Sequence, residues 1–339
     1  MSSKPLVSII TPSYNQAAYI EDTIQSVLAQ DYTPIEYIIV DGASTDGSQE
    51  IIKRYEKQLS WWISEPDAGQ AEAINKGFNQ AQGEIIAWLN SDDLYLFNAV
   101  SAAADSLVKN PDLGLVFGNA MTIDTNGRPL NKLVFGDWGL KELLSYRIIC
   151  QPAVFIRREI LDQAGYLDPS FHFMLDHQLW IRIAMSAPIQ YINPSSNRDN
   201  PGLWAAARHH PTAKNVAQAE GFSIEAFRLM AWMKSQPELA PLLNEHKNNV
   251  YAGLYRLSGR YLLDGGLPGR ALKAYMNAFL RNPSFTLKHW HRILYAAACT
   301  VGLESVADSI YQRIPKKYPN LEKISGLTGW PGLFVDDIN

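Results

Sequence analysis

Residues 85–93 read Ile85-Ile86-Ala87-Trp88-Leu89-Asn90-Ser91-Asp92-Asp93. The first five residues form a continuous apolar run, which predicts a buried strand from Glu84 to Leu89. Two carboxylates follow at the carboxyl end of this strand, where open α/β sheets bind their ligands. Carboxylate oxygens are the hard ligands that Mg²⁺ and Mn²⁺ prefer. An aspartate pair at this position is also typical of a turn or a helix N-cap, so the surrounding pattern decides its meaning.

That surrounding pattern is an alternation of strands and helices. Apolar runs predict strands at residues 7–11, 36–40, 61–65 and 84–89, and helical periodicity predicts helices at 19–30, 48–59, 69–81 and 98–110. This order is typical of stacked β-α-β units, and it predicts a mixed, mostly parallel sheet with helices on both faces. We also expect a strand at 115–123, a turn at 124–127 and a helix at 175–185.

The pattern changes after about Val216, where strand-like runs stop and helical periodicity takes over. Gly265-Gly266 separates two periodic segments, which predicts a helical pair around residues 250–283 that resembles one tetratricopeptide unit. The repeat does not recur, so no array is predicted. We therefore expect two parts, an α/β domain over residues 1–215 and an α-helical C-terminal region over residues 216–339.

Composition narrows the functional classes. Apolar residues make up 47% of the 339 residues, charged residues make up 19%, and the net charge is -4, which does not indicate a nucleic-acid partner. Cys150 and Cys299 have neither metal-ligand spacing nor the frequency of a disulfide framework. No signal-peptide pattern opens the sequence, and the apolar run at 294–301 is too short to span a bilayer. These features favour a cytoplasmic location.

Three polar loops follow three of the predicted strands. They are Thr11-Pro12-Ser13-Tyr14-Asn15, the run from Asp41 to Gly47, and Asn90-Ser91-Asp92-Asp93. Each loop alone is explained by turn chemistry. Because parallel strands present these loops at one edge of the sheet, we expect Tyr14, Asp41 and Asp93 to converge there.

Together these motifs resemble the family 2 glycosyltransferases of the GT-A fold. The resemblance rests on the run from Val7 to Asn15, on Ile39-Val40-Asp41-Gly42 with the following Ser44-Thr45-Asp46-Gly47-Ser48, and on Leu89-Asn90-Ser91-Asp92-Asp93. It covers roughly residues 5–215. It implies a GT-A domain that transfers one sugar, of the hexosyl type, from a nucleotide-sugar donor with metal assistance and inversion at the anomeric carbon.

The resemblance assigns the nucleoside to the first two loops, and carries over to Thr11, Pro12, Tyr14, Asn15 and Asp41. The residue chemistry agrees, since a carboxylate accepts a hydrogen bond from the N–H edge of a uracil-type base and an aromatic ring stacks on the base. These features favour a UDP- or dTDP-linked sugar. A cap for the turn at Gly42–Gly47 remains the alternative for Asp41.

A further segment, Asp67-Ala68-Gly69-Gln70 followed by Asn75-Lys76-Gly77, also resembles the family. The resemblance places Asp67, Gly69 and Gln70 near the donor, and Lys76 would add positive charge toward the diphosphate. Capping explains Asp67 equally well, and a solvated helix lysine is the alternative for Lys76.

The metal assignment follows the same resemblance. Family members often carry Asp-x-Asp, whereas this chain has Ser91-x-Asp93, so Asp93 is the expected ligand of Mn²⁺ or Mg²⁺ and Asp92 a contact to ribose or donor sugar. One carboxylate, the diphosphate oxygens and water complete an octahedron. His210, in Arg208-His209-His210, matches a family histidine that approaches the metal or the diphosphate, and Arg208 or Lys214 would neutralise phosphate. A cationic loop without a fixed role is the alternative for this stretch.

An inverting transfer also needs a general base to take the proton of the acceptor hydroxyl. In the family this is the aspartate of a Glu-Asp pair that opens a helix. Asp176 takes that place here, with Leu175 in place of the glutamate. An aspartate at a helix N-terminus is favourable on electrostatic grounds alone, so a structural role stays open, and His177 is the second candidate for the base.

The sequence thus predicts an inverting glycosyltransferase that acts on a glycan or glycolipid hydroxyl, as in polysaccharide biosynthesis. A nucleotidyltransferase and a non-catalytic assembly module are the alternatives, although nucleotidyltransferases usually carry a Gly-rich loop after the first strand. The late helices, with Lys288, Trp290 and Arg292 beside an apolar run, would bind a partner protein, pack against the first domain, or lie peripherally at the inner face of a membrane.

Overall fold

The computed structural model describes residues 4–192, 202–211, 213–303 and 305. It divides the chain into two compact units. The first is an α/β unit built from Met1–Gly139 and Ile149–His209, and the second is a helical unit built from Leu140–Ile148 and the described chain from His210 onward. The short segment Leu140–Ile148 therefore belongs with the helices, although it lies inside the range that the sequence assigns to the α/β domain.

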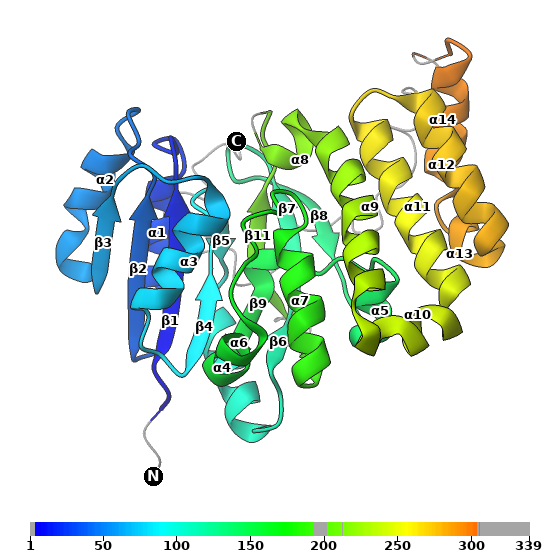
Figure 1. Cartoon of the computed structure of the whole chain (residues 1–339). Helices are drawn as coiled ribbons and strands as arrows, with labels where there is room; N and C mark the ends of the chain where they lie inside the picture. The colour runs from blue at the N-terminus through cyan, green and yellow to red at the C-terminus, as the bar shows by residue number, and fades with distance from the viewer. Residues whose placement is uncertain (1–3, 193–201, 212, 304, 306–339) are drawn as a thin grey trace. The chain divides into compact units, whose positions relative to one another are not determined.

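A seven-stranded sheet is the centre of the α/β unit (Figure 1). Its order is β10-β6-β9-β4-β1-β2-β3. β1 is parallel to β2 and β4, β2 is parallel to β3, and β6 is parallel to β10, whereas β9 is antiparallel to both of its neighbours. The strands are β1 (Val7–Ser13), β2 (Ile35–Asp41), β3 (Trp61–Ser64), β4 (Ile85–Trp88), β6 (Leu115–Phe117), β9 (Val154–Arg157) and β10 (Ile189–Tyr191). The predicted mixed, mostly parallel sheet is confirmed.

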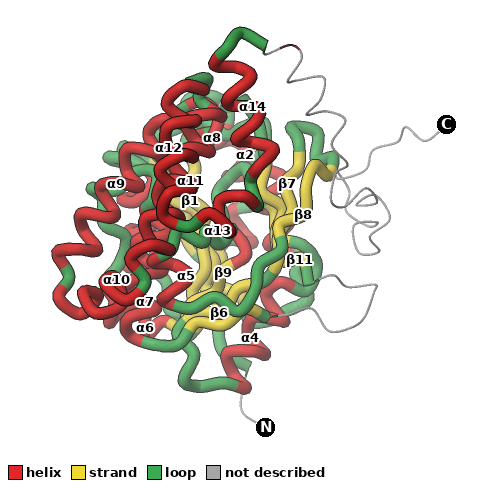
Figure 2. Tube along the Cα trace, turned by 90° about the vertical axis from the view of Figure 1, so that its right-hand side faces the viewer, coloured by secondary structure: helices red, strands yellow, loops and turns green. Residues whose placement is uncertain are grey.

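A second sheet of four strands has the order β5-β11-β7-β8. It consists of β5 (Leu94–Tyr95), β7 (Asn119–Ile123), β8 (Pro129–Leu133) and β11 (Leu203–Arg208). β7 and β8 form a hairpin through the predicted turn at 124–127, where the Gly127 N–H donates to the Asp124 carbonyl and Gly127 has a φ of 78° (Figure 2). Glycine occupies this left-handed conformation without strain.

Helices cover both faces of the main sheet, as the alternation of side chains along β1 shows. Ile9 lies in the same buried cluster as α1, α2 and α4, whereas Ile10 faces α3 so closely that a Cβ on Gly77 would meet its Cγ2 at 2.4 Å. The helices of this unit are α1 (Ile20–Leu28), α2 (Ser48–Arg54), α3 (Gln70–Gln80), α4 (Ala99–Lys109), α6 (Arg158–Ala164) and α7 (Leu175–Ser186), with 3₁₀ turns η1 (Glu56–Gln58) and η2 (Gln151–Ala153). Helices on both faces are therefore confirmed.

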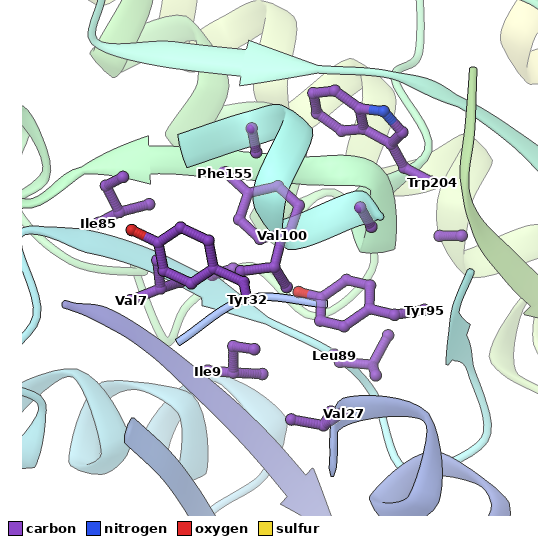
Figure 3. Close-up of a cluster of buried hydrophobic side chains, with 14 of the residues drawn as sticks. Val7, Ile9, Val27, Tyr32, Ile85, Leu89, Tyr95, Val100, Phe155 and Trp204 are labelled. Atoms are coloured by element: carbon purple, nitrogen blue, oxygen red, sulfur yellow. The ribbon is translucent and has the colours of Figure 1, made fainter. Parts of the chain in front are cut away.

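The cluster that contains Ile9 joins both sheets to the helices (Figure 3). Val7, Ile85 and Phe155 come from neighbouring strands of the main sheet, and Tyr95 and Trp204 come from the second sheet. Tyr95 stacks on Phe155 with ring centroids 5.4 Å apart. Each fully buried large side chain contributes on the order of 1.5–3 kcal/mol of transfer free energy, so this cluster fixes the strands whose ends carry the polar loops.

The single strand expected at 115–123 is wrong. Gly118 divides the segment into β6 and β7, which belong to different sheets. A Cβ at Gly118 would lie 2.3 Å from the Trp204 ring, so the indole occupies the space where a side chain would point. The helix expected at 48–59 likewise ends at Arg54 and continues as η1, whereas the other helices predicted in the first 110 residues, and the helix at 175–185, agree within two residues at each end.

The described part of the second unit contains helices and 3₁₀ turns. α9 packs on α11, α11 on α12, and α12 on both α13 and α14, which form a row (Figure 1). The elements are α5 (Leu140–Leu144), α8 (Lys214–Ala217), α9 (Ala219–Ser235), η3 (Pro237–Leu239), α10 (Ala240–Glu245), α11 (Lys247–Asp264), α12 (Pro268–Arg281), α13 (Pro283–Leu287) and α14 (Trp290–Thr300).

Small residues and one tyrosine hold the end of this row together. Ala271, Ala274 and Tyr275 of α12 form a buried cluster with Leu262 of α11 and Ala296 of α14. A Cβ on Gly259 of α11 would lie 3.1 Å from the Tyr275 ring, so the glycine permits the close approach of the two helices. α11 and α12 are the helical pair predicted around residues 250–283.

Candidate active site

Asp41, at the carboxyl end of β2, is fully buried and organises the loop that follows it. Its Oδ2 accepts hydrogen bonds from the Ser44 backbone N–H at 2.9 Å and from the Ser64 hydroxyl at 2.6 Å, and its Oδ1 accepts one from the Ser44 hydroxyl. Ser64 ends β3, which is parallel to β2. The carboxylate thus joins the ends of two strands and caps the turn, which is the structural role that the sequence left open.

The first loop is held against the second by hydrogen bonds in both directions. The Asn15 N–H donates to the Ser44 hydroxyl at 2.8 Å, and the Asn15 side-chain oxygen accepts from the Thr45 N–H at 2.9 Å. Asn15 has a φ of 52°, a conformation that asparagine tolerates better than most residues. Two loops that are 30 residues apart in the chain therefore lie against each other. This agrees with the expectation that loops after parallel strands meet at one edge of the sheet.

Tyr14 and Asp67 both approach the backbone of Gly42. A Cβ on Gly42 would lie 2.8 Å from Asp67 Oδ2 and 3.3 Å from the Tyr14 ring. The Tyr14 side chain is 64% exposed, so one face of the ring is available to a ligand. Asp67 also accepts the Gly69 N–H at 2.9 Å, just before α3 begins. Tyr14 and Asp67 therefore lie next to the Asp41 loop, and their contacts with a donor stay predictions.

Thr11 and Pro12 lie within β1 and are buried. The Thr11 hydroxyl shares a hydrogen bond of 3.1 Å with the Tyr37 hydroxyl. Burial raises the pKa of Tyr37 well above its usual range, so this phenol stays neutral. The structure thus engages the Thr11 side chain inside the sheet, and its contact with a nucleoside stays a prediction.

Lys76 forms an ion pair with Glu65, which follows β3. Part of its charge is therefore balanced within the protein. Its predicted contribution to diphosphate binding requires that it leave or share this partner.

A chain of amide side chains leads from α3 to the aspartate pair. Gln70 donates to the Asn90 side-chain oxygen at 2.8 Å, and the Asn90 amide donates to Asp93 Oδ2 at 3.1 Å and to Gln151 at 3.2 Å. Gln151 in turn donates to the Trp88 carbonyl at 2.7 Å. Asn90 and Gln151 were not predicted as site residues. No local pattern marks Gln151, because its partners are about 60 residues earlier in the chain.

Asp93 is 6% exposed, and both carboxylate oxygens are held. Oδ1 accepts the Arg208 backbone N–H at 3.0 Å, and Oδ2 accepts the Asn90 amide. Burial, and then the neighbouring Asp92 carboxylate, raise the pKa of Asp93 well above its ordinary value. The anionic form of this side chain is therefore costly unless positive charge is nearby.

Arg208 is the nearby cation, and it is almost completely buried at the end of β11. Its guanidinium donates to the Asp92 carbonyl at 3.0 Å and to Asp22 at 3.1 Å, and it lies 4.8 Å from the centre of the Tyr19 ring. Arg208 therefore fixes the Asp92-Asp93 turn against α1. This is a positioning role, in place of the phosphate contact that the sequence suggested.

Asp176 lies in the first turn of α7, and its Oδ1 accepts the His177 N–H at 2.7 Å. Trp180, one turn later, stacks on Trp88 of β4 with ring centroids 5.1 Å apart. Arg182 anchors the same helix by donating to the carbonyls of Ala164, Gly165 and Tyr166. These contacts hold the N-terminal turn of α7 in a fixed place on the sheet.

The Cys150 thiol is influenced electrostatically by both Asp176 and Asp93. Burial raises the pKa of its thiol, and the negative charges of Asp93 and Asp176 raise it further. Both carboxylates are therefore close enough to act electrostatically on one thiol. The structure thus brings the predicted metal ligand and the predicted base to the same part of the α/β unit.

His210 is buried and belongs to the helical unit, where its carbonyl accepts the Ala213 N–H. Its role as a metal ligand stays a prediction.

Comparison with known proteins identifies the family. The family model described as glycosyl transferase family 2 matches residues 8–164. TuaG of Bacillus subtilis (strain 168), a glycosyltransferase assigned to teichuronic acid biosynthesis, is 35% identical over 186 residues, which cover 53% of this chain and 72% of TuaG. The chain belongs to the family 2 glycosyltransferases. An uncharacterized glycosyltransferase of Rickettsia conorii is 28% identical over 249 residues, which are 64% of this chain and 40% of that protein.

Solved structures show that this family 2 glycosyltransferase has the GT-A fold. S. aureus TarS 1–349 has a TM-score of 0.55 at 18% identity, and the match covers 90% of this chain and 91% of TarS. The mannosyltransferase PcManGT of Pyrobaculum calidifontis, in complex with GDP-Man and Mn²⁺, has a TM-score of 0.56 at 20% identity. The match covers 91% of this chain and 87% of PcManGT. Family membership also favours a glycosyltransferase over the nucleotidyltransferase alternative.

Proposed function

We propose that this glycosyltransferase transfers a hexosyl group from a UDP- or dTDP-linked donor to a hydroxyl of a glycan or lipid-linked glycan, with inversion. The observation that carries this proposal is the convergence of polar groups at the strand ends of the α/β unit. The loops of Asp41 and Asn15 are hydrogen-bonded together, Tyr14 and Asp67 approach the backbone of Gly42, and the charges of Asp93 and Asp176 both raise the pKa of the Cys150 thiol.

The nucleoside is proposed to bind at the exposed ring of Tyr14. Its face offers stacking to a base, and Asp67 beside it offers an acceptor for a base or ribose N–H or O–H. Asp41 is proposed to act mainly by stabilising the Gly42–Gly47 loop. Thr11, Pro12 and Asn15 are proposed to line the nucleoside site. Gly69 and Gln70 lie at the N-terminus of α3, whose helix dipole favours a diphosphate. A TarS structure holds UDP-GlcNAc, and PcManGT holds GDP-Man, which supports a nucleotide-sugar donor.

Asp93 is proposed as the ligand of a divalent cation, and Asp92 as a contact to the ribose or the donor sugar. The donor set is carboxylate oxygen, and the raised pKa of Asp93 beside Asp92 marks an electrostatic cost that a cation offsets. Among the residues that the structure describes, no group of three or more His, Cys, Asp or Glu side chains is arranged to hold a metal. The donor diphosphate is therefore proposed to supply the remaining ligands. A bound Mn²⁺ or Mg²⁺ would stabilise the charge of the leaving nucleoside diphosphate.

Asp176 is proposed as the general base. As the acceptor oxygen bonds to the anomeric carbon and the bond from that carbon to the diphosphate breaks, the hydroxyl proton moves to the Asp176 carboxylate. The His177 N–H and the N-terminus of α7 both favour the anionic form that accepts it. Leu175, in place of the usual glutamate, leaves this carboxylate unchanged.

The acceptor is proposed to be a growing polysaccharide, because a relative with substantial coverage, TuaG, is assigned to teichuronic acid biosynthesis. The two free cysteines, Cys150 and Cys299, support the proposed cytoplasmic location.

A donor panel tests the proposal. The full chain is incubated with UDP-, dTDP- and GDP-sugars and Mn²⁺, with and without chelator, and released nucleoside diphosphate is measured. We expect release from a UDP- or dTDP-sugar that the chelator stops. Release from no donor, while UDP still binds, would favour the non-catalytic module, and release that the chelator does not affect would contradict the metal assignment.

A further inference from the structure

The last helices of the chain carry positive charge without acidic neighbours in sequence. Between Gly265 and Leu303 there is no Asp or Glu, although the whole chain has a net charge of -4. The same segment carries Arg270, Lys273, Arg281, Lys288 and Arg292. Arg270 pairs with Glu220 and Arg292 pairs with Asp264, both of the helical unit. Lys273, Arg281 and Lys288 are exposed.

The charges are also concentrated in space. His289 has its pKa lowered to about 3, first by burial and then by Arg256, Arg292, His291 and Arg147 around it. Arg147 and Arg256 both lie over the Phe285 ring, at 5.0 and 5.9 Å from its centre. Arg147, Arg256 and Arg292 therefore lie within electrostatic reach of His289 in the helical unit, which adds positive potential behind the exposed Lys288.

The same segment exposes large apolar side chains. Trp290 and Leu294 of α14 are 53% and 60% exposed, and Val301 follows at a spacing that keeps it on the same face. The opposite side of α14 carries Ile293 and Ala296, which pack on α12. Leu280 of α12 is 75% exposed, and Met276 precedes it by one helical turn. Half of the exposed large hydrophobic side chains of the described residues lie between Met276 and Leu303.

We propose that α12, α13 and α14 form a docking surface for an anionic lipid bilayer. Exposed lysine and arginine suit lipid phosphates, and Trp290 with the aliphatic side chains suits the boundary between headgroups and acyl chains. A soluble polyanion would bind the cations but would not need the apolar stripe that Trp290, Leu294 and Val301 form. None of the described helices is long and apolar enough to cross a membrane. This inference goes beyond the proposed sugar transfer and does not depend on it.

Sedimentation with vesicles tests the surface. The full chain is mixed with vesicles of phosphatidylcholine alone, or with an equal part of phosphatidylglycerol, at low and high salt. We expect binding to the anionic vesicles that salt weakens. The double variant Lys273→Gln/Lys288→Gln should bind about fivefold more weakly for each charge removed, since a cation near an anionic surface contributes about 1 kcal/mol. Leu294→Ser should also weaken binding severalfold.

Matched variants provide the controls. Ile224→Ser removes a side chain that is 62% exposed on α9 of the same unit, and Lys109→Gln removes an exposed lysine of α4. Neither should change binding. Equal binding to both kinds of vesicle, or an equal loss in these controls, would overturn the proposal.

Two further measurements distinguish other occupants. Binding to inorganic polyphosphate without binding to vesicles would assign the surface to a soluble polyanion, and a dimer that Leu294→Ser dissociates would assign it to a second copy; either overturns the proposal. The melting temperature of Leu294→Ser should equal that of the parent. A marked decrease would show that the rest of the chain covers the stripe, and would also overturn it.

Discussion

The two units use polar residues in opposite ways. In the α/β unit, Asp41, Asp93 and Arg208 are buried and hydrogen-bonded between elements far apart in the chain, such as Arg208 and Asp22. In the helical unit, the exposed cations Lys273, Arg281 and Lys288 come from one contiguous segment that also exposes Trp290 and Leu294. The first arrangement holds individual side-chain atoms at defined positions. The second gives a surface its positive charge and its hydrophobicity.

This difference predicts how each unit responds to substitution. Where single atoms are fixed, one exchange should remove one step of the reaction and leave the fold intact. Where a surface acts by its composition, each exchange should have a small effect that adds to the next. The predictions below test this contrast.

Asp176→Asn should have the largest effect. If Asp176 takes the acceptor proton, sugar transfer should fall by roughly two to four orders of magnitude, the usual range for general-base catalysis. Donor affinity should stay the same, because the carboxylate acts on the acceptor. The transfer rate is measured by steady-state kinetics, and the donor affinity by calorimetry of UDP binding. Asp162→Asn on α6 is the control, and near-parental transfer by Asp176→Asn would move the base to His177.

Asp93→Asn should weaken Mn²⁺-dependent UDP binding by at least about tenfold to a hundredfold, the loss seen when even outer-shell partners of a metal are removed. The amide keeps the shape but is a poorer ligand for a hard cation. Calorimetry with and without Mn²⁺ measures it, and circular dichroism should show an unchanged fold. Equal Mn²⁺-UDP affinity in both proteins would exclude Asp93 as the ligand.

Two tyrosines of the helical unit form a matched pair with a smaller effect. The buried Tyr146 hydroxyl donates to the Ala226 carbonyl at 2.8 Å, whereas the buried Tyr275 hydroxyl has no hydrogen-bond partner within the described chain. Tyr146→Phe should cost about 0.5–1.5 kcal/mol of unfolding free energy because it removes a buried hydrogen bond to a helix carbonyl. Tyr275→Phe should be neutral or stabilising. Urea denaturation measures both, and equal losses would contradict this explanation.

The last prediction concerns the response of the helical unit to acid. Since the pKa of His289 is lowered to about 3 from 6.5, the unfolded chain binds the proton more tightly than the folded chain between these values. The unfolding free energy should therefore fall as the pH drops below about 6.5, and His289→Gln should flatten this slope. Urea denaturation at several pH values measures it. The exposed His172→Gln is the control, and an unchanged slope in His289→Gln would contradict the assignment.

Local sequence pattern predicted the strands, the loops after them and the family, because these signals depend only on residues that are close together in the sequence. It did not predict the break at Gly118, which depends on Trp204 in a strand 86 residues later. It also missed Gln151, and it assigned Arg208 a contact with phosphate rather than with Asp22 and Asp93. Each of these depends on a partner that only folding brings close.

A crystal structure of the full chain with UDP and Mn²⁺ tests the central claim most directly, namely that the strand ends of the α/β unit hold the donor and the metal. We predict that the metal contacts an Asp93 oxygen and the diphosphate, that the base stacks on Tyr14, and that Asp176 faces the open side of the diphosphate. A nucleotide bound away from Tyr14, or a metal that does not contact Asp93, would contradict it.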